Sequence, residues 1–203
     1  MLLPSLIAAV VALAHLSSAA ATLDARRMRT CVPDLEAGEV LNVFRAGQAD
    51  EAWEFLPSTK YPTAVTGGAV YLSQTDTPEN GGWYLSEVEG QNGTFTLSLA
   101  SQEAGVQCLR TVGKNRAVTT GPCDQLKSTF TLTCTTCPSS SASSSSADAS
   151  ARYLARACTF TSLASPGYCL QAVAAAGSPG LGQLEARKCA ARSRAQAWDL
   201  VRA

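Results

Sequence analysis

Few residues in this 203-residue chain have side chains and neighbours suited to catalysis. The single histidine, His15, lies in an uncharged and mostly apolar N-terminal stretch that we expect to be removed. Without it, no histidine remains for Ser-His-Asp or Cys-His nucleophilic catalysis, or for a histidine-ligated zinc. None of the sixteen acidic residues stands in a recognisable motif, and there is no Gly-rich phosphate-binding loop. Unless two carboxylates converge only in the fold, we expect no enzyme, no metal site and no cofactor.

The eight cysteines are the other chemically distinctive residues, and all lie beyond the apolar N-terminus. An even number of cysteines in an exported chain indicates disulfides. The spacing Cys134-x-x-Cys137 also occurs in redox motifs, but those need a strand-to-helix context that this Thr-rich segment does not offer. A four-cysteine zinc site is a further alternative, and export favours disulfides over it.

Residues 1–21 are typical of a secretory signal peptide, although they lack its usual positive charge. Leu2 to Leu16 is almost continuously apolar, and Ser18-Ala19-Ala20 has the small-x-small pattern of a cleavage site. No later run approaches the ~20 apolar residues of a membrane helix. We therefore expect a secreted, extracellular protein without a membrane anchor. Residues 22–37 form a charged lead-in, in which Arg26-Arg27 is either a dibasic processing site or two solvated arginines.

The charge is balanced over the whole chain, with sixteen basic and sixteen acidic residues. The sequence shows no basic stripe, which argues against nucleic acid as a partner. A balanced chain is also a poor candidate for electrostatic steering toward a strongly charged partner.

Three stretches of the chain end in the same way, with an aromatic-x-Leu close at Trp83, Phe130 and Trp198. Each stretch begins with a short alternating apolar run and continues through a polar turn. The second interval is longer than the first, mostly because of a Ser-rich insertion at 138–151. Repetition at about 45 residues, with strand patterns and no helical period, predicts an array of all-β units.

The second and third stretches also share a Cys-Leu-x-x-Val segment at Cys108 and Cys169, followed by a second cysteine at Cys123 and Cys189. Together with the terminal Gln196-Ala197-Trp198, this pattern resembles the ricin B-type β-trefoil repeat, in which a Q-x-W element closes each of three subdomains. The resemblance implies one all-β domain, a β-trefoil of three repeats. The Ser-rich insertion before the third repeat has almost nothing to bury, so we expect it to be a disordered loop. The resemblance also implies disulfides Cys108–Cys123 and Cys169–Cys189. The ranges are 38–203 for the domain and about 38–85, 86–132 and 152–203 for its repeats.

Four cysteines remain outside the repeat pattern and allow three connectivities: Cys31, Cys134, Cys137 and Cys158. We favour a disulfide from Cys158 to Cys134 or to Cys137, because either would join the two ends of the serine loop. Such closures restrict the unfolded chain and contribute ~2–4 kcal/mol each.

The resemblance also implies where a sugar would bind. In ricin-type units an Asp beside the Cys-Leu pair, an aromatic about twelve residues before the closing Trp and an Asn just before Q-x-W hold the sugar. A ring stacks on the sugar face, while a carboxylate and an amide bind its hydroxyls. The second unit has Arg110, Val118 and Lys127 at these places, and the third has Gln171, Ala186 and Ala195. Both units therefore lack the pattern.

The first unit retains two of the three residues, although it has no cysteine pair and carries Gly81-Gly82-Trp83 at its close. Tyr71 stands twelve residues before Trp83, and Asn80 stands three before it. The matching acid is not evident, and Asp76 is a possible substitute. The alternative, that Tyr71 is an ordinary half-buried strand tyrosine, stays open and is the simpler interpretation of the residue. We expect Trp53 and Trp83 to be core residues, because large aromatics dominate core burial.

The sequence thus predicts a secreted lectin-like protein that binds glycans through Tyr71, Asn80 and Asp76. The alternative is a secreted β-trefoil scaffold that binds no sugar and contacts an extracellular protein, for example as an inhibitor. β-Trefoils host both functions, so the fold does not choose between them. Asn92-Gly93-Thr94 is the only N-glycosylation sequon and lies where a turn should separate two repeats, which predicts a glycoprotein.

Overall fold

The computed structural model describes residues 30–35, 38–48, 50–55, 69–74, 82–100, 106–138, 153–174 and 182–203. These residues form twelve strands and one short 3-10 helix, η2 (Arg194–Gln196). The strands are β1 (Val40–Arg45), β2 (Glu51–Phe55), β3 (Val70–Gln74), β4 (Trp83–Glu87), β5 (Thr94–Leu99), β6 (Cys108–Thr111), β7 (Val118–Gly121), β8 (Thr129–Thr133), β9 (Tyr153–Ser162), β10 (Tyr168–Ala174), β11 (Gly182–Lys188) and β12 (Trp198–Arg202). No helix in the described part of the chain is long and apolar enough to cross a membrane.

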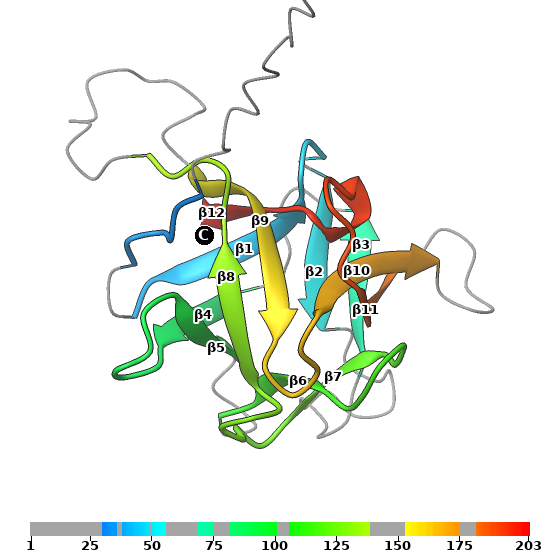
Figure 1. Ribbon diagram of the computed structural model, residues 1–203. Helices are drawn as coiled ribbons and strands as arrows, with labels where there is room; N and C mark the ends of the chain where they lie inside the picture. The colour runs from blue at the N-terminus through cyan, green and yellow to red at the C-terminus, as the bar shows by residue number, and fades with distance from the viewer. Residues whose placement is uncertain are drawn as a thin grey trace, which may run out of the picture.

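The strands follow one plan in three successive groups of four (Figure 1). In each group the first and fourth strands belong to a closed ring of six antiparallel strands, in the order β1, β4, β5, β8, β9 and β12. The second and third strands form hairpins, namely β2–β3, β6–β7 and β10–β11. A six-stranded barrel with three hairpins is a β-trefoil, the fold that the repeats predict.

The three closing aromatics occupy equivalent positions in the barrel. Each has one Cα partner on the first strand of its own unit and another on the first strand of the next unit. On each of these first strands, the residue that pairs with the aromatic of the preceding unit comes four residues after the one that pairs with the aromatic of its own unit. The partners are Leu41 and Leu99 for Trp83, Phe95 and Ser162 for Phe130, and Cys158 and Arg45 for Trp198. All three aromatic side chains are fully buried. The predicted threefold repetition is therefore confirmed in the strand register.

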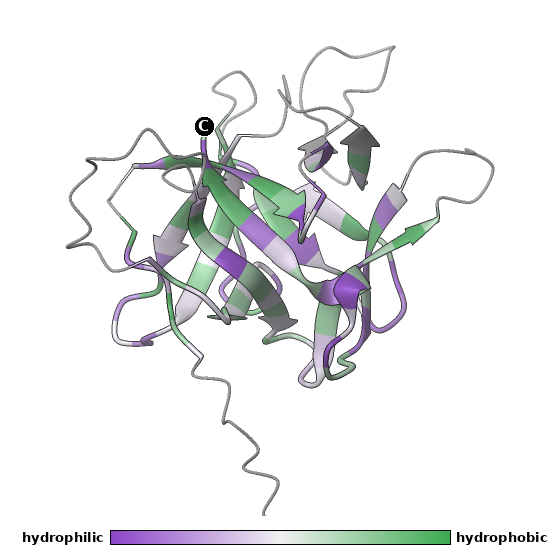
Figure 2. Cartoon of the chain, turned by 90° about the horizontal axis from the view of Figure 1, so that it is seen from above, coloured by the Kyte–Doolittle hydropathy of each residue, from purple (hydrophilic) through white to green (hydrophobic). Residues whose placement is uncertain are grey.

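Trp53 on β2 lies among the largest side chains of the core. Its ring centroid is 4.9 Å from that of Trp198, 5.2 Å from that of Phe160 and 6.3 Å from that of Trp83. Trp53 and Trp83 are both fully buried, as the sequence predicts. Along β1 and β5, buried positions mostly alternate with partly buried ones, as expected when one face of a strand covers a core. Hydrophobic and hydrophilic residues likewise follow one another along the strands in Figure 2. The hairpin of the first unit is thus anchored by a core residue.

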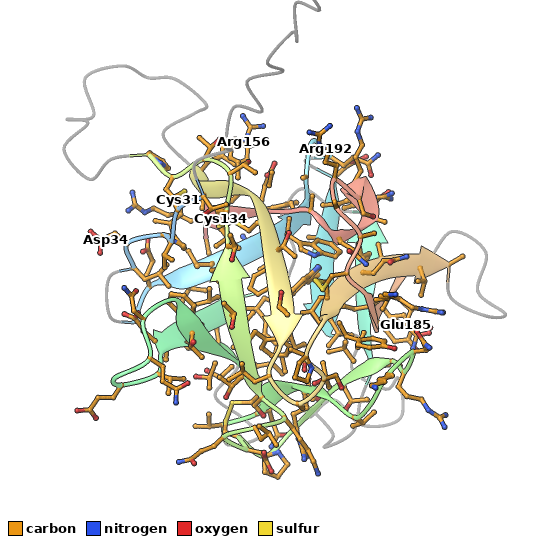
Figure 3. All side chains as sticks on the ribbon, viewed as in Figure 1. Cys31, Asp34, Cys134, Arg156, Glu185 and Arg192 are labelled. Carbon is orange, nitrogen blue, oxygen red and sulfur yellow. A yellow bond between two sulfur atoms is a disulfide. The ribbon has the colours of Figure 1, made fainter. Side chains whose placement is uncertain are left out.

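Four disulfides join all eight cysteines. Cys108–Cys123 and Cys169–Cys189 are the two that the resemblance implies, and Cys134–Cys158 is one of the two favoured for the serine loop. The fourth, Cys31–Cys137, ties the N-terminal segment to the segment that follows β8. Backbone hydrogen bonds also link Cys31 and Cys134 in both directions at 2.9 Å (Figure 3). Since Cys134 and Cys137 pair with different cysteines, they do not form a redox disulfide with each other.

Several predictions fall on residues that the structure does not describe. The signal peptide, the Arg26-Arg27 site and most of the Ser-rich loop, 139–151, lie outside the described residues. The sequon lies within them, and Asn92 is exposed in the turn between β4 and β5. Gly93 follows with a φ of +74°, which suits a glycine in a tight hairpin turn.

Deleting Ser139 to Ser146 should change the free energy of unfolding by about 1 kcal/mol or less. The two sides of the loop are already held together by the Cys134–Cys158 disulfide and by a 2.8 Å hydrogen bond from the Arg156 N–H to the Thr136 carbonyl. Changing the length of a flexible loop costs only ~0.6 kcal/mol per doubling. Thermal melts of the two proteins would measure the difference, and a large loss of stability would mean that the segment packs against the barrel.

Candidate functional site

The candidate site lies on the β2–β3 hairpin of the first unit. Val70 and Leu72 on β3 are buried in the core, whereas Tyr71 between them is only partly buried. Because side chains alternate along a strand, Tyr71 belongs to the outer face of the hairpin. The sequence prediction that this ring is available to a ligand is therefore compatible with its position. Asp76 and Asn80 lie in 75–81, outside the described residues.

Contacts among the three hairpins identify the positions that correspond to Tyr71. Tyr71 pairs with Gln183 on β11, while Ala69 pairs with Thr119 and Ala117 pairs with Glu185. These three pairings repeat around the molecule, so Tyr71, Thr119 and Glu185 occupy equivalent places. The twelve-residue count had instead assigned Val118 and Ala186, and both of these are fully buried. The count was wrong because the connections between the hairpin and the closing aromatic differ in length.

The same register locates an acidic residue that the sequence analysis missed. The Cα partner of Tyr71 is Glu54, and the partners of Thr119 and Glu185 are Arg110 and Gln171. Arg110 and Gln171 are the two residues that the sequence assigned to the place of the sugar-binding Asp. Glu54 is therefore at the acid position of the first unit.

The position of Glu54 was hidden because Ala52-Trp53 stands where the other units have Cys-Leu. Cys108, Cys169 and Ala52 occupy corresponding places in the three hairpin registers, with partners Gly121, Arg187 and Ser73. Comparing Ala52-Trp53-Glu54 with Cys108-Leu109-Arg110 gives the same alignment. The signal was present in the sequence, but it needed a match that tolerates Ala for Cys and Trp for Leu. With Glu54 at this position, Asp76 is not required as a substitute.

In the second unit the corresponding surface is basic. The Arg110 guanidinium packs so closely on Gly121 that a Cβ there would lie 2.7 Å from Nη1. Asp124 lies in the following turn, where the N–H groups of Lys127 and Leu126 donate to its carboxylate at 2.9 Å. These bonds, with smaller contributions from the charges of Lys127 and Arg110, hold the pKa of Asp124 below its usual value. The strand partner of Arg110 is Thr119, so the second unit has neither an aromatic ring nor a carboxylate at this position.

In the third unit the outer face of the hairpin is filled by its own polar contacts. Arg187 and Glu185 form an ion pair at 2.6 Å. The Gln196 amide donates to the Gln171 side-chain oxygen and to the Lys188 carbonyl, both at 2.9 Å, and its oxygen accepts from the Ala190 N–H at 2.8 Å. Gln196 is the glutamine of the Q-x-W element, so here this residue holds the turn after β11.

No known protein-family profile matches this chain, and no curated protein sequence does. Solved structures do match. They include the designed threefold-symmetric protein ThreeFoil, with a TM-score of 0.52 and 14% identity over 81% of this chain and 99% of that one. A Polyporus squamosus lectin bound to a sialylated, human-type influenza-binding epitope has a TM-score of 0.53 and 13% identity over 82% of this chain and 50% of that one.

The C-terminal domain of an earthworm lectin, a mutant in complex with 6′-sialyllactose, has a TM-score of 0.50 and 10% identity over 81% of this chain and 99% of that one. At these identities the similarity concerns the fold alone. The fold is a β-trefoil. The similarity leaves the choice of ligand to the residues of this chain.

Proposed function

We propose that this protein is a secreted, lectin-like carbohydrate-binding protein without catalytic activity, and that its first unit binds the sugar. One observation carries the proposal: only in the first unit does the hairpin register set an aromatic residue, Tyr71, opposite an acidic one, Glu54. A sugar offers a weakly apolar face and several hydroxyls. A ring can cover that face, while a carboxylate accepts hydrogen bonds from the hydroxyls.

The residues of the other two units also favour the first unit as the binding site. The second unit pairs Thr119 with Arg110, and the third pairs Glu185 with Gln171, so neither has a ring at this position. Without a ring to replace water on the sugar face, little net affinity remains after the polar groups have lost their hydration. The two lectins of the same fold, which were crystallised with sialylated sugars, add general support for a glycan as the ligand.

The disulfide content supports the proposed location. Four disulfides in the described part of the chain fit an oxidising environment such as the extracellular space. Asn92, exposed in the turn between β4 and β5, is positioned for the proposed N-glycan. It lies on the barrel and not on the β2–β3 hairpin, so we propose that a glycan there leaves the Tyr71 surface accessible.

A glycan array with the mature, oxidised protein tests the function, and we expect it to identify at least one bound glycan. On that glycan, Glu54→Gln should weaken binding about 5- to 10-fold, because a hydrogen bond to a carboxylate is worth roughly 1 kcal/mol more than one to an amide. Glu51→Gln is the matched control: it makes the same change on the same strand, in a residue paired with Arg45 at 3.0 Å. If a broad array shows no binding, the scaffold that contacts an extracellular protein becomes the better account.

A further inference from the structure

The balanced total charge conceals an uneven distribution along the chain. Residues 106–203 hold eleven of the sixteen basic residues but only four of the sixteen acidic ones. The third unit, 152–203, is therefore basic, with seven basic and two acidic residues, whereas the part of the chain before residue 106 is acidic. The sequence has no long run of basic residues. The excess basic residues can therefore form a positively charged surface only where the fold brings separate segments together.

The turn between β6 and β7 docks against β11 of the next unit. The Asn115 N–H donates to the Ala186 carbonyl at 2.8 Å, and the Ala186 N–H donates to the Arg116 carbonyl at 3.0 Å. Asn115 has a φ of 54°, the left-handed conformation that asparagine tolerates better than most residues. These contacts fix Lys114 and Arg116, both exposed, beside β11.

Tyr168 at the start of β10 lies close to Lys114 and pairs with a second lysine, Lys188. The Lys114 ammonium lies 5.5 Å from the centroid of the Tyr168 ring. Lys188 is the Cα partner of Tyr168, so the two side chains leave neighbouring strands on the same face. Lys114 of the second unit and Lys188 of the third are thus placed next to one tyrosine.

The loop after β11 extends the positive charge. Gln196, which is buried, binds both the Lys188 carbonyl and the Ala190 N–H and so keeps this loop compact. Arg192 and Arg194 are exposed on it. In Figure 3, Arg192 of this loop is labelled at the top of the molecule, and Glu185 of β11 is labelled lower down. We define the basic band as Lys114, Arg116, Lys188, Arg192 and Arg194.

The described residues offer the basic band no neutralising partner. None of its five residues is in the four ion pairs found there. The nearest acidic residue on β11, Glu185, is paired with Arg187. Side-chain alternation puts that pair on the opposite face from Ala186 and Lys188. Among the described residues, the positive charge of the basic band is therefore not neutralised by an ion pair.

We propose that the basic band binds an acidic polysaccharide, a chain that carries sulfate or carboxylate groups at regular intervals. Five cations spread over a β-turn, a strand end and a loop match a linear polyanion better than a single small anion. An anionic membrane fits less well, because only one of the exposed large hydrophobic residues among those described, Val112, lies in a turn that carries the band. The others are Val32, Val106 and Leu126. Tyr71 is also next to β11 but at the start of that strand, opposite Gln183, whereas Lys188 is at its end, so the proposed band does not depend on the Tyr71 surface.

The test uses heparin as the probe and measures its affinity by titration calorimetry at several salt concentrations. The double variant Lys114→Gln/Lys188→Gln should weaken heparin binding at least 10-fold. It should also reduce the slope of log Kd against log salt by about one to two, because each ion pair that no longer forms means that fewer counterions are released on binding. The control, Lys127→Gln/Arg202→Gln, removes the same charge from exposed residues outside the band and should stay within about twofold of the wild type. Thermal melts would confirm that both variants fold.

The proposal is overturned if the wild type does not bind heparin, or if both double variants lose affinity equally, which would indicate a net-charge effect. Tighter binding to duplex DNA or to phosphatidylserine vesicles than to heparin would show that the band serves a different partner. Tyr71→Ala should bind heparin normally. If it does not, the two surfaces are one site and the separate band is wrong, whereas a negative result with neutral glycans alone would affect only the first unit.

Discussion

Replacing Trp53 by alanine should lower the free energy of unfolding by about 3–5 kcal/mol, the usual cost of removing a buried large aromatic. Trp53 is fully buried and contacts the rings of Trp83, Phe160 and Trp198. These rings belong to the first and third units. The cavity left by Trp53 would therefore remove the contacts between the first hairpin and the barrel. At roughly 2–4 °C per kcal/mol for a domain of this size, the melting temperature should fall by about 6–20 °C.

The control for this change is Val112→Ala, which shortens a side chain that is 56% exposed. Surface substitutions of this kind change stability by about 0.5 kcal/mol or less. Calorimetric melts of the oxidised proteins would compare the two variants with the wild type. Equal, small effects would mean that Trp53 does not belong to the core, and the placement of the first hairpin would then be wrong.

Tyr71→Ala should reduce glycan affinity about 30-fold, which for a weak ligand means no detectable binding. The lost ring removes both the apolar area that covers the sugar and the stacking itself, together roughly 2 kcal/mol. Tyr71→Phe should retain most of the affinity, because the ring face survives and only the hydroxyl is lost. Since Tyr71 is partly exposed, neither variant should unfold the protein.

Thr119→Ala is the matched control, because Thr119 occupies the position in the second unit that Tyr71 occupies in the first. It should bind the same glycan as tightly as the wild type. Titration of all four proteins with one neutral glycan separates the units. A loss of affinity in Thr119→Ala, with normal binding in Tyr71→Ala, would move the site to the second unit and contradict the proposal.

The fold could be read from the sequence because its repeats survive where the core needs them. Trp83, Phe130 and Trp198 keep an aromatic at each closing position, and all three are fully buried. The paired cysteines of the second and third units mark the hairpins, and their disulfides form as the resemblance implies. For the other four cysteines the sequence left more than one connectivity open. No nearby sequence pattern indicates that Cys31 pairs with Cys137, which is 106 residues away.

The site was less accessible to sequence reasoning because loops shift the spacing that a count relies on. Counting back from the closing aromatic led to Val118 and Ala186, whereas pairing between hairpins identifies Thr119 and Glu185. Glu54 was missed because Ala52-Trp53 replaces the Cys-Leu pair that precedes this position in the other units. The basic band was missed for a different reason: Lys114 comes close to Tyr168, the strand partner of Lys188, only because the β6–β7 turn docks on β11.

The most direct test of the account is an NMR titration of the mature, disulfide-bonded protein, with labelled tyrosine rings, against a neutral glycan identified on the array. The chain has five tyrosines, and Tyr71→Phe would assign the ring signal of Tyr71. We predict that the Tyr71 ring signals shift with increasing glycan while those of Tyr153 and Tyr168 stay unchanged. Saturating binding that leaves the Tyr71 signals in place would show that the sugar binds elsewhere and would contradict the assignment of the first unit.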